Sequence, residues 1–270
     1  MRRKRQTSFY LPCFRKFKML FGEFNALINF EELASLHLLS EIVENETLAD
    51  MLLRVAPRYN IFITDVRLAD FETVLRKSFL NHPFACFEAF LDDFKAEYKI
   101  FVNQDFILVD DDDISKLEKF TKSLKQDRII SQISSYLIDL YTYFRLVRNQ
   151  VTHHLGDDRE LKNAYKRVEK NRDAIIERFG HVPHTPEGIT FEDFKLCAQV
   201  LYEIAELFSI SVENHIDWGN LDYVEKKIVS QSRVNRFRDN PKRLRKYIDN
   251  SFMSNFGIKA PQKAVSRIMR

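Results

Sequence analysis

Apolar residues recur every three or four positions through most of this chain, which is the spacing of helices that bury one face. The clearest case is the range 128–154, where alternating steps of three and four connect apolar residues without interruption. These residues are Ile130, Ile133, Leu137, Leu140, Phe144, Val147 and Val151. Such a stripe packs against other helices of the same chain or against a second copy of the chain.

The same spacing predicts helices over much of the remaining sequence. The predicted ranges are 29–55, 70–80, 83–102, 110–124, 160–180 and 190–216. A break is expected at 81–83, because the residue before a proline avoids helical geometry. Gly180 is expected as a C-terminal cap, and Thr190 with Asp193 as an N-terminal cap. The range 59–66 instead looks short and extended.

Four consecutive aspartates, Asp110 to Asp113, open the range 110–124. Aspartates there would cap the first N–H groups of a helix and suit the positive end of its dipole. A metal site is the alternative, but consecutive side chains on a helix point in different directions. We therefore expect a helix N-terminus without a bound metal.

Helices joined by short connections predict an all-α bundle. Only six glycines and seven prolines occur in 270 residues, which fits a chain with few helix breaks. We expect three parts: a basic, aromatic-rich N-terminal segment (1–30), a helical domain (31–215) and a basic C-terminal tail (216–270).

The cysteines Cys13, Cys86 and Cys197 are far apart and form no Cys-x-x-Cys pair. This pattern argues against a disulfide framework or a cysteine zinc site and indicates a reducing compartment. No apolar run reaches the length of a membrane span, and Arg15 and Lys16 interrupt the apolar core that a signal peptide needs. These features predict a soluble, cytoplasmic protein that does not act at a membrane.

The formal net charge of +3 conceals two basic ends around an acidic middle. Residues 1–20 carry seven Lys or Arg and no acid, and residues 224–270 carry 13 Lys or Arg against three acids. Basic ends that also bear aromatic residues are typical of contacts to a polyanion such as RNA. The residues predicted to contact nucleic acid are Lys242, Arg243, Arg245 and Lys246. Solvated basic tails are the alternative.

The candidate chemistry lies at the end of the clearest helix, in the sequence RLVRNQVTHHLG. Arg148 and Asn149 are followed after three residues by His153, and a glycine, Gly156, follows shortly after. This arrangement resembles the signature of the HEPN superfamily, Arg-Asn-x-x-x-His, which lies near the end of a long amphipathic helix in an all-helical bundle. The resemblance covers the layout of 31–215, but only the motif carries it in sequence.

The resemblance implies an all-α HEPN-like bundle and metal-independent RNA cleavage, in which the 2′-OH attacks the adjacent phosphate and leaves a cyclic phosphate end. It makes His153 the acid or base, Arg148 the phosphate stabiliser and Asn149 the positioning group. These residue types suit the roles, because histidine exchanges protons near neutrality and arginine presents fixed donors to growing negative charge. It also implies a homodimer in a toxin or phage-defence setting, with RNA as substrate and an antitoxin or regulator as partner, and neither cofactor nor metal.

Helix geometry complicates this assignment. At about 100° per residue, Arg148 and His153 lie about 140° apart, whereas Asn149 and His153 share a face. The site would need either a loosened last helical turn or residues from two chains. His154 is the alternative acid or base, although it lies on the line of the apolar stripe. Arg145 is a secondary candidate for a phosphate contact.

Other residues bear on the same resemblance. One HEPN group carries a modified tyrosine where this chain has Leu155, so that form of control is not expected. The candidates for an acidic residue facing the motif, as in some HEPN members, are Glu88, Asp92, Asp93 and Glu97. A zinc site that includes His181 and His184 is disfavoured, because histidines in proline-rich turns are usually structural. The predicted function is therefore an endoribonuclease, and the alternative is a non-catalytic HEPN-like or other helical module that binds RNA or protein through its basic ends.

Overall fold

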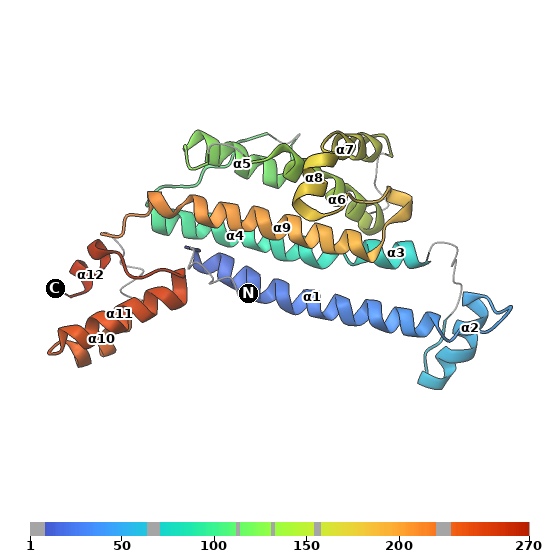
Figure 1. Ribbon diagram of the computed structural model, residues 1–270, viewed down its shortest axis with the longest axis horizontal. Coiled ribbons are helices and arrows are strands. Elements are labelled where there is room, and N and C mark those ends of the chain that lie inside the picture. The colour runs from blue at the N-terminus through green and yellow to red at the C-terminus, as the bar shows by residue number, and fades with distance from the viewer. Residues whose placement is uncertain are drawn as a thin grey trace. The chain divides into compact units, whose positions relative to one another are not determined.

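The computed structural model describes residues 9–63, 71–111, 114–130, 133–153, 158–219 and 228–269, without the side chains of 151–153 and 158. Every regular element in these residues is a helix, so the all-α prediction is confirmed (Figure 1). None of these helices combines the length and the apolar character that crossing a membrane requires.

Contacts divide the chain into two compact units, each built from separate stretches of sequence. Unit 1 contains residues 1–19, 86–134 and 201–270, and unit 2 contains residues 20–85 and 135–200. This division differs from the three consecutive parts expected from the sequence. The long helices α1 (Pro12–Leu39), α4 (Asn81–Val102) and α9 (Phe191–Ser211) supply residues to both units.

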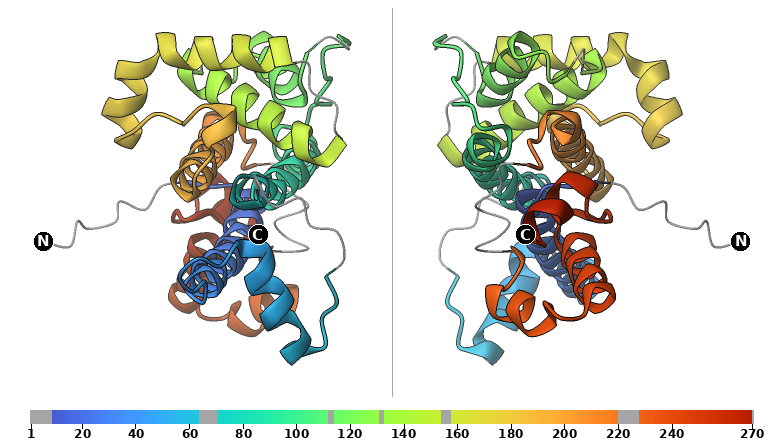
Figure 2. Two further views of the ribbon diagram at one scale, coloured as in Figure 1. Left: turned by 90° about the vertical axis from the view of Figure 1, so that its right-hand side faces the viewer. Right: turned by 90° about the vertical axis from the view of Figure 1, so that its left-hand side faces the viewer.

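Unit 1 has an aromatic core between α4 and α9, which lie side by side (Figures 1 and 2). Phe94 of α4 lies at its centre, with its ring 5.6 Å from that of Phe208 and 6.4 Å from that of Phe120. Phe120 belongs to α5 (Lys116–Gln126). Aromatic pairs with tilted rings add about 0.5–1.5 kcal/mol each beyond the area that they bury. Phenylalanine, of which the chain has 24, therefore forms the centre of the core of unit 1.

The described parts of both basic ends of the sequence are folded into unit 1. The N-terminal end is fixed where the backbone N–H of Tyr10 donates to Phe256 O at 3.0 Å and that of Leu11 donates to Ser209 Oγ at 2.7 Å. The C-terminal end forms α10 (Gln231–Phe237), α11 (Pro241–Phe256) and α12 (Gln262–Ile268). The buried residues of α11 are Leu244, Ile248, Phe252 and Phe256. The described part of the basic C-terminal tail expected at 216–270 is therefore largely helical.

Unit 2 is organised around α6 (Ser135–His153), which packs against α3 (Phe71–Ser78) and α7 (Asp158–Lys170). The apolar stripe faces inward: Leu137, Leu140, Phe144 and Val147 are at most 1% exposed. Of the two open alternatives, the structure therefore uses the stripe for packing within the chain. These four residues are not available for a second copy.

Several helix boundaries differ from those expected. The range 29–55 is broken into α1 and α2 (Leu48–Val55), because Thr47 starts a new helix with a capping box to Asp50. The range 160–180 is likewise divided into α7 and α8 (Arg172–Phe179). No strand forms in the described part of 59–66, which begins at the last residue of a 3-10 helix, η1 (Ala56–Tyr59). The Gly180 cap is confirmed, with φ at 87°.

The aspartate run does not cap α5. Ser115 is the N-cap, and its hydroxyl and the Glu118 carboxylate form a complete capping box. Asp110 and Asp111 precede this cap, and Asp111 pairs with Lys122 at 3.1 Å. Asp112 and Asp113 lie outside the described residues. The prediction of an aspartate-capped N-terminus was therefore wrong. Ser115 and Glu118 accept hydrogen bonds from each other's backbone N–H groups and so cap the helix without the aspartates.

Candidate active site

The motif lies on the last turns of α6, where Arg148 is half-buried and held from two sides. Its Nε donates a hydrogen bond to Asn149 Oδ1 at 3.2 Å. Its guanidinium lies 5.1 Å from the ring centroid of Phe84, a fully buried residue of α4. A cation above an aromatic face gains electrostatic stabilisation and loses rotational freedom. The side chain of Arg148 is therefore oriented before any ligand arrives.

A buried cysteine of the same unit feels the charge of Arg148. Burial raises the pKa of the Cys197 thiol well above its ordinary value of 9.0, and the positive charge of Arg148 opposes this change. Cys197 thus stays a neutral thiol near pH 7, and neutral thiols are poor nucleophiles. Cys197 is therefore not a candidate nucleophile.

Arg145, one turn earlier on α6, is only partly neutralised. Its Nη2 lies 3.8 Å from Glu160 Oε1 of α7, at the outer limit of an ion pair. Its Nε is buried and donates to no partner among the described residues. An unpaired buried donor costs about 1–3 kcal/mol. This arginine therefore retains donor capacity beside the motif.

The histidines can be located only in part. α6 remains helical through His153, so its backbone does not loosen between Arg148 and His153. The side chain of His153 and the whole of His154 lie outside the described residues. At about 100° per residue, the separation of about 140° between Arg148 and His153 therefore holds on α6. The structure brings Arg148 and Asn149 together and leaves the histidine partner unassigned.

The four acidic candidates of α4 belong to unit 1, and the contacts of Asp92, Asp93 and Glu97 lie within that unit. Asp92 pairs with Lys116 at 2.6 Å, and Asp93 pairs with Lys16 at 2.7 Å. Glu97 accepts a hydrogen bond from the backbone N–H of Cys13 at 2.9 Å. These contacts explain the three carboxylates as parts of unit 1.

A polar cluster that the sequence did not reveal surrounds Asp193, whose carboxylate is fully buried. It accepts hydrogen bonds from the backbone N–H groups of His184 at 2.8 Å and Thr190 at 2.7 Å. It also contacts His184 Nδ1 at 2.9 Å, and the Tyr143 hydroxyl donates to the carbonyl of His184. The spacing of Thr190 and Asp193 had predicted part of this cluster. The contact with His184 depends on how the 181–190 turn folds back.

The cluster around Asp193 ties the turn to α6 and α9 and does not form a metal centre. No group of three or more His, Cys, Asp or Glu residues within the described part of the chain is arranged to hold a metal ion. The zinc alternative, which would also need His153 and His154, therefore gains no support from His181 and His184.

The predicted nucleic-acid contacts lie on a basic surface of α10 and α11. Its exposed cations are Arg233, Arg236, Arg238, Lys242, Arg243 and Lys246. The Arg243 guanidinium lies 4.8 Å from the centre of the Phe237 ring. Arg245 differs from the other predicted contacts, because its Nε donates to Asp249 Oδ2 at 3.0 Å and its Nη1 donates to Gln262 Oε1 at 3.0 Å. Arg245 therefore holds α11 and α12 together.

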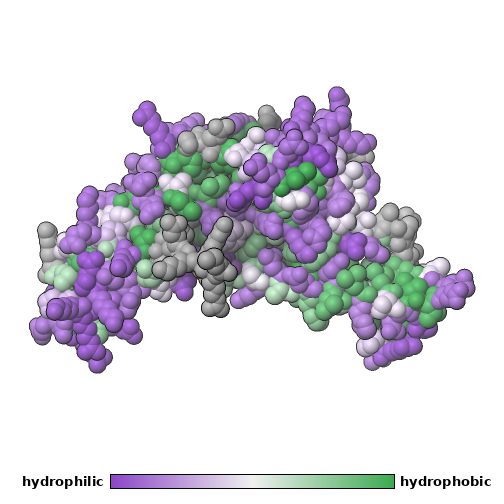
Figure 3. All heavy atoms as spheres, in the orientation of Figure 1, coloured by the Kyte–Doolittle hydropathy of each residue, from purple (hydrophilic) through white to green (hydrophobic). Residues whose placement is uncertain are grey.

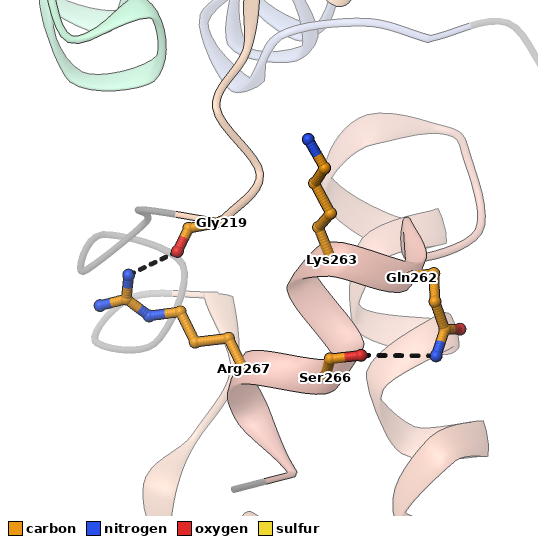
Figure 4. Close-up of a pocket in the computed structure, with 5 residues that line it drawn as sticks. All are labelled: Gly219, Gln262, Lys263, Ser266 and Arg267. Atoms are coloured by element: carbon orange, nitrogen blue, oxygen red, sulfur yellow. Dashed lines mark hydrogen bonds between the residues drawn. The ribbon is translucent and has the colours of Figure 1, made fainter.

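A surface pocket of about 530 Å³ lies beside α12 in unit 1 and is lined by Gly219, Gln262, Lys263, Ser266 and Arg267 (Figure 4). Lys263 and Arg267 project from the same helix, and Arg267 Nη1 donates to the carbonyl of Gly219 at 2.7 Å. Among the described residues of the lining, two are cations and none is acidic. Its charge therefore favours anionic groups.

No protein-family model, curated protein or solved structure matches this chain significantly.

Proposed function

We propose that this protein is a metal-independent endoribonuclease of the HEPN type. The observation that carries the proposal is the sequence Arg148-Asn149-x-x-x-His153 at the end of α6, in an all-α protein, with Arg148 held by Asn149 and Phe84 yet still half-exposed. A toxin or phage-defence setting, with an antitoxin or regulator as partner, belongs to the same proposal and rests on the resemblance alone.

The proposed chemistry needs three functions, and arginine supplies one without a metal. Arg148 would hold the scissile phosphate and stabilise the charge that grows on it. Asn149 would orient Arg148 through its Oδ1. His153 would take the proton of the attacking 2′-OH or deliver a proton to the leaving 5′-oxygen. The products would be a 2′,3′-cyclic phosphate and a 5′-hydroxyl.

The helical path of α6 through His153 favours a site completed by two copies. Positions 148 and 153 lie about 140° apart around one helix, so a phosphate contacted by both residues is more easily reached from two chains. Because the apolar stripe of α6 is buried within unit 2, the copies would meet through another surface. Mixing the Arg148→Ala and His153→Ala variants tests this idea. Recovered cleavage in the mixture is expected for a shared site, and no recovery contradicts it.

The main test is cleavage of labelled RNA in the presence of EDTA. Wild-type protein should give cyclic phosphate ends, and both Arg148→Ala and His153→Ala should lose at least a hundredfold in rate. Arg172→Ala, which removes an exposed arginine of α8, is the matched control and should retain activity. His154→Ala should also retain activity. Equal cleavage by all variants, or by none, would refute the catalytic role of the motif.

The second candidate function is RNA binding without cleavage through the basic surface of α10 and α11. It is favoured by six exposed cations with Phe237 and Tyr247 packed beneath two of them, at 4.8 Å from Arg243 and 5.8 Å from Arg233. Binding of this kind weakens steeply with salt, because neutralised phosphates release counterions. Lys242→Glu combined with Lys246→Glu should abolish it. Binding that both changes leave intact would exclude this surface.

A further inference from the structure

The C-terminal half of α1 carries apolar residues on both its buried and its exposed sides. On the buried side, Ile28 packs with Phe79 and Phe194 in the core of unit 2. The buried Glu32 on this side is paired with Arg76 of α3 at 3.4 Å. The opposite side faces solvent. A helix that is hydrophobic all round is normally covered on every side.

None of the exposed residues of this half-helix is charged, and Glu31, which lies between them in the sequence, is half-buried. Its exposed residues between positions 26 and 37 are Ala26, Leu27, Asn29, Phe30, Leu33, Ala34, Leu36 and His37. Four of them form what we call the α1 apolar face: Leu27, Phe30, Leu33 and Leu36, which are 44%, 67%, 65% and 50% exposed. A solvated face of a helix normally carries Lys, Glu or Arg. This face therefore has the composition of an interface.

More apolar side chains of unit 2 are exposed in the segment that follows. Leu53 of α2 is 62% exposed, Tyr59 is 70% exposed and Phe62 is 88% exposed. Figure 3 shows hydrophobic residues gathering over the C-terminal half of α1 and over α2. Single exposed apolar residues are ordinary, but an exposed patch of contiguous ones marks an interaction site.

Acidic residues outnumber basic ones around the α1 apolar face, where Arg54 is paired with Glu46 at 2.8 Å and also donates to the carbonyl of Glu41. Residues 20–53 contain seven Asp or Glu and no Lys or Arg. Glu23 is exposed before the face, and Glu41 and Glu44 are exposed after it. An occupant that carries acidic groups would be repelled, and one with basic groups at its edges would be attracted.

We propose that the α1 apolar face binds a basic amphipathic helix of a partner protein. Residues 26–37 extend over about 18 Å of helix, which matches a partner helix of about three turns. Its apolar residues would lie against Phe30 and Leu33, and its Lys or Arg residues would reach Glu23, Glu41 and Glu44. This is recognition of a helix by an apolar surface, with charge selecting the partner. The proposal does not depend on RNA cleavage.

Other occupants fit the charges less well. A second copy docked through the same face would bring two acidic rims together, which like-charge repulsion opposes. The chain's own basic helix α11 cannot serve, because its apolar residues Leu244, Ile248, Phe252 and Phe256 are already buried. An anionic bilayer would be repelled by the same carboxylates.

Two synthetic helices test the proposal. Both carry the same leucine face, and one has lysine and the other glutamate at the remaining positions. Fluorescence anisotropy should show that the lysine peptide binds the full-length protein and that the glutamate peptide does not. Phe30→Ser combined with Leu33→Ser should weaken binding at least tenfold, whereas Ile107→Ser, at a residue of unit 1 that is 77% exposed, should not change it. Glu41→Lys combined with Glu44→Lys should weaken binding of the lysine peptide and strengthen binding of the glutamate peptide.

Each other outcome overturns the proposal. Equal binding of the two peptides would show that charge does not select the partner. Absence of binding, or binding unaffected by the Phe30 and Leu33 changes, would exclude the α1 apolar face. A wild-type dimer that the Phe30→Ser and Leu33→Ser variant converts to a monomer would assign the face to a second copy. Circular dichroism of each variant confirms folding, which these exposed positions should not affect.

Discussion

Glu97 should make unit 1 less stable as the pH rises toward neutrality. Burial raises the pKa of this carboxyl from its ordinary value of 4.5 to about 7, and the charge of Asp93 adds to the effect, while hydrogen bonds from Cys13 and the charge of Lys16 oppose it. The folded protein therefore holds a proton that the unfolded chain has released. The resulting stabilisation is complete below pH 4.5 and is lost as the pH rises through about 7.

The size of the effect follows from the pKa. Each pKa unit corresponds to about 1.4 kcal/mol, so the full change corresponds to about 3 kcal/mol. The carboxylate is partly exposed, and screening by water should reduce the effect to about 1–2 kcal/mol. Glutamine stays neutral at every pH and keeps an oxygen that can accept from the Cys13 N–H. Glu97→Gln should therefore match wild type below pH 4.5 and exceed its stability by about 1–2 kcal/mol at pH 8.

Urea unfolding of both proteins at pH 4.5, 6 and 8 measures this difference as a change in the free energy of unfolding. Glu88→Gln, on the same helix, controls for the loss of one carboxylate. A difference between Glu97→Gln and wild type that is the same at all three pH values would refute the reasoning. So would a wild type that is the more stable protein at pH 8.

Three further stability predictions follow from the packing and the caps. Phe144→Ala removes a fully buried ring from the stripe of α6 and should cost about 3–5 kcal/mol in urea unfolding; a cost below about 1 kcal/mol would show that the stripe is not packed. Asp193→Ala leaves two backbone N–H groups without their acceptor and should cost about 2–4 kcal/mol, with faster amide hydrogen exchange at His184 and Thr190. Unchanged exchange there would contradict the hydrogen bonds from these two N–H groups to Asp193. Ser115→Ala removes the cap of α5 and should lower the free energy of unfolding by about 1 kcal/mol, whereas Ser115→Asp should restore most of it.

The sequence by itself determined the helices with strong apolar periodicity. The stripe of α6 was predicted residue by residue, and Leu137, Leu140, Phe144 and Val147 are buried as its spacing requires. The Gly180 cap was also predicted, because a left-handed backbone favours glycine. These features depend on neighbours three or four residues apart, and such neighbours are visible in the sequence.

Local competition decided the boundaries that the sequence analysis missed. Thr47 with Asp50 starts α2 inside a range that periodicity treated as continuous. Ser115 with Glu118 displaces the aspartates as the cap of α5. In both cases a complete capping box forms: the N-cap hydroxyl accepts from the N3 backbone N–H, and the N3 carboxylate accepts from the N-cap backbone N–H.

Only the tertiary structure decided how the basic ends and the motif are used. Arg245 could not be distinguished from Lys242 or Lys246 by charge, yet it holds α11 and α12 through Asp249 and Gln262. Arg148 lies over Phe84, which is 64 positions earlier in the chain. Contacts between residues so far apart depend on how helices pack. Spacing along a single helix therefore predicted which faces are apolar, and tertiary packing determined which of them are buried and which, like the α1 apolar face, are left exposed.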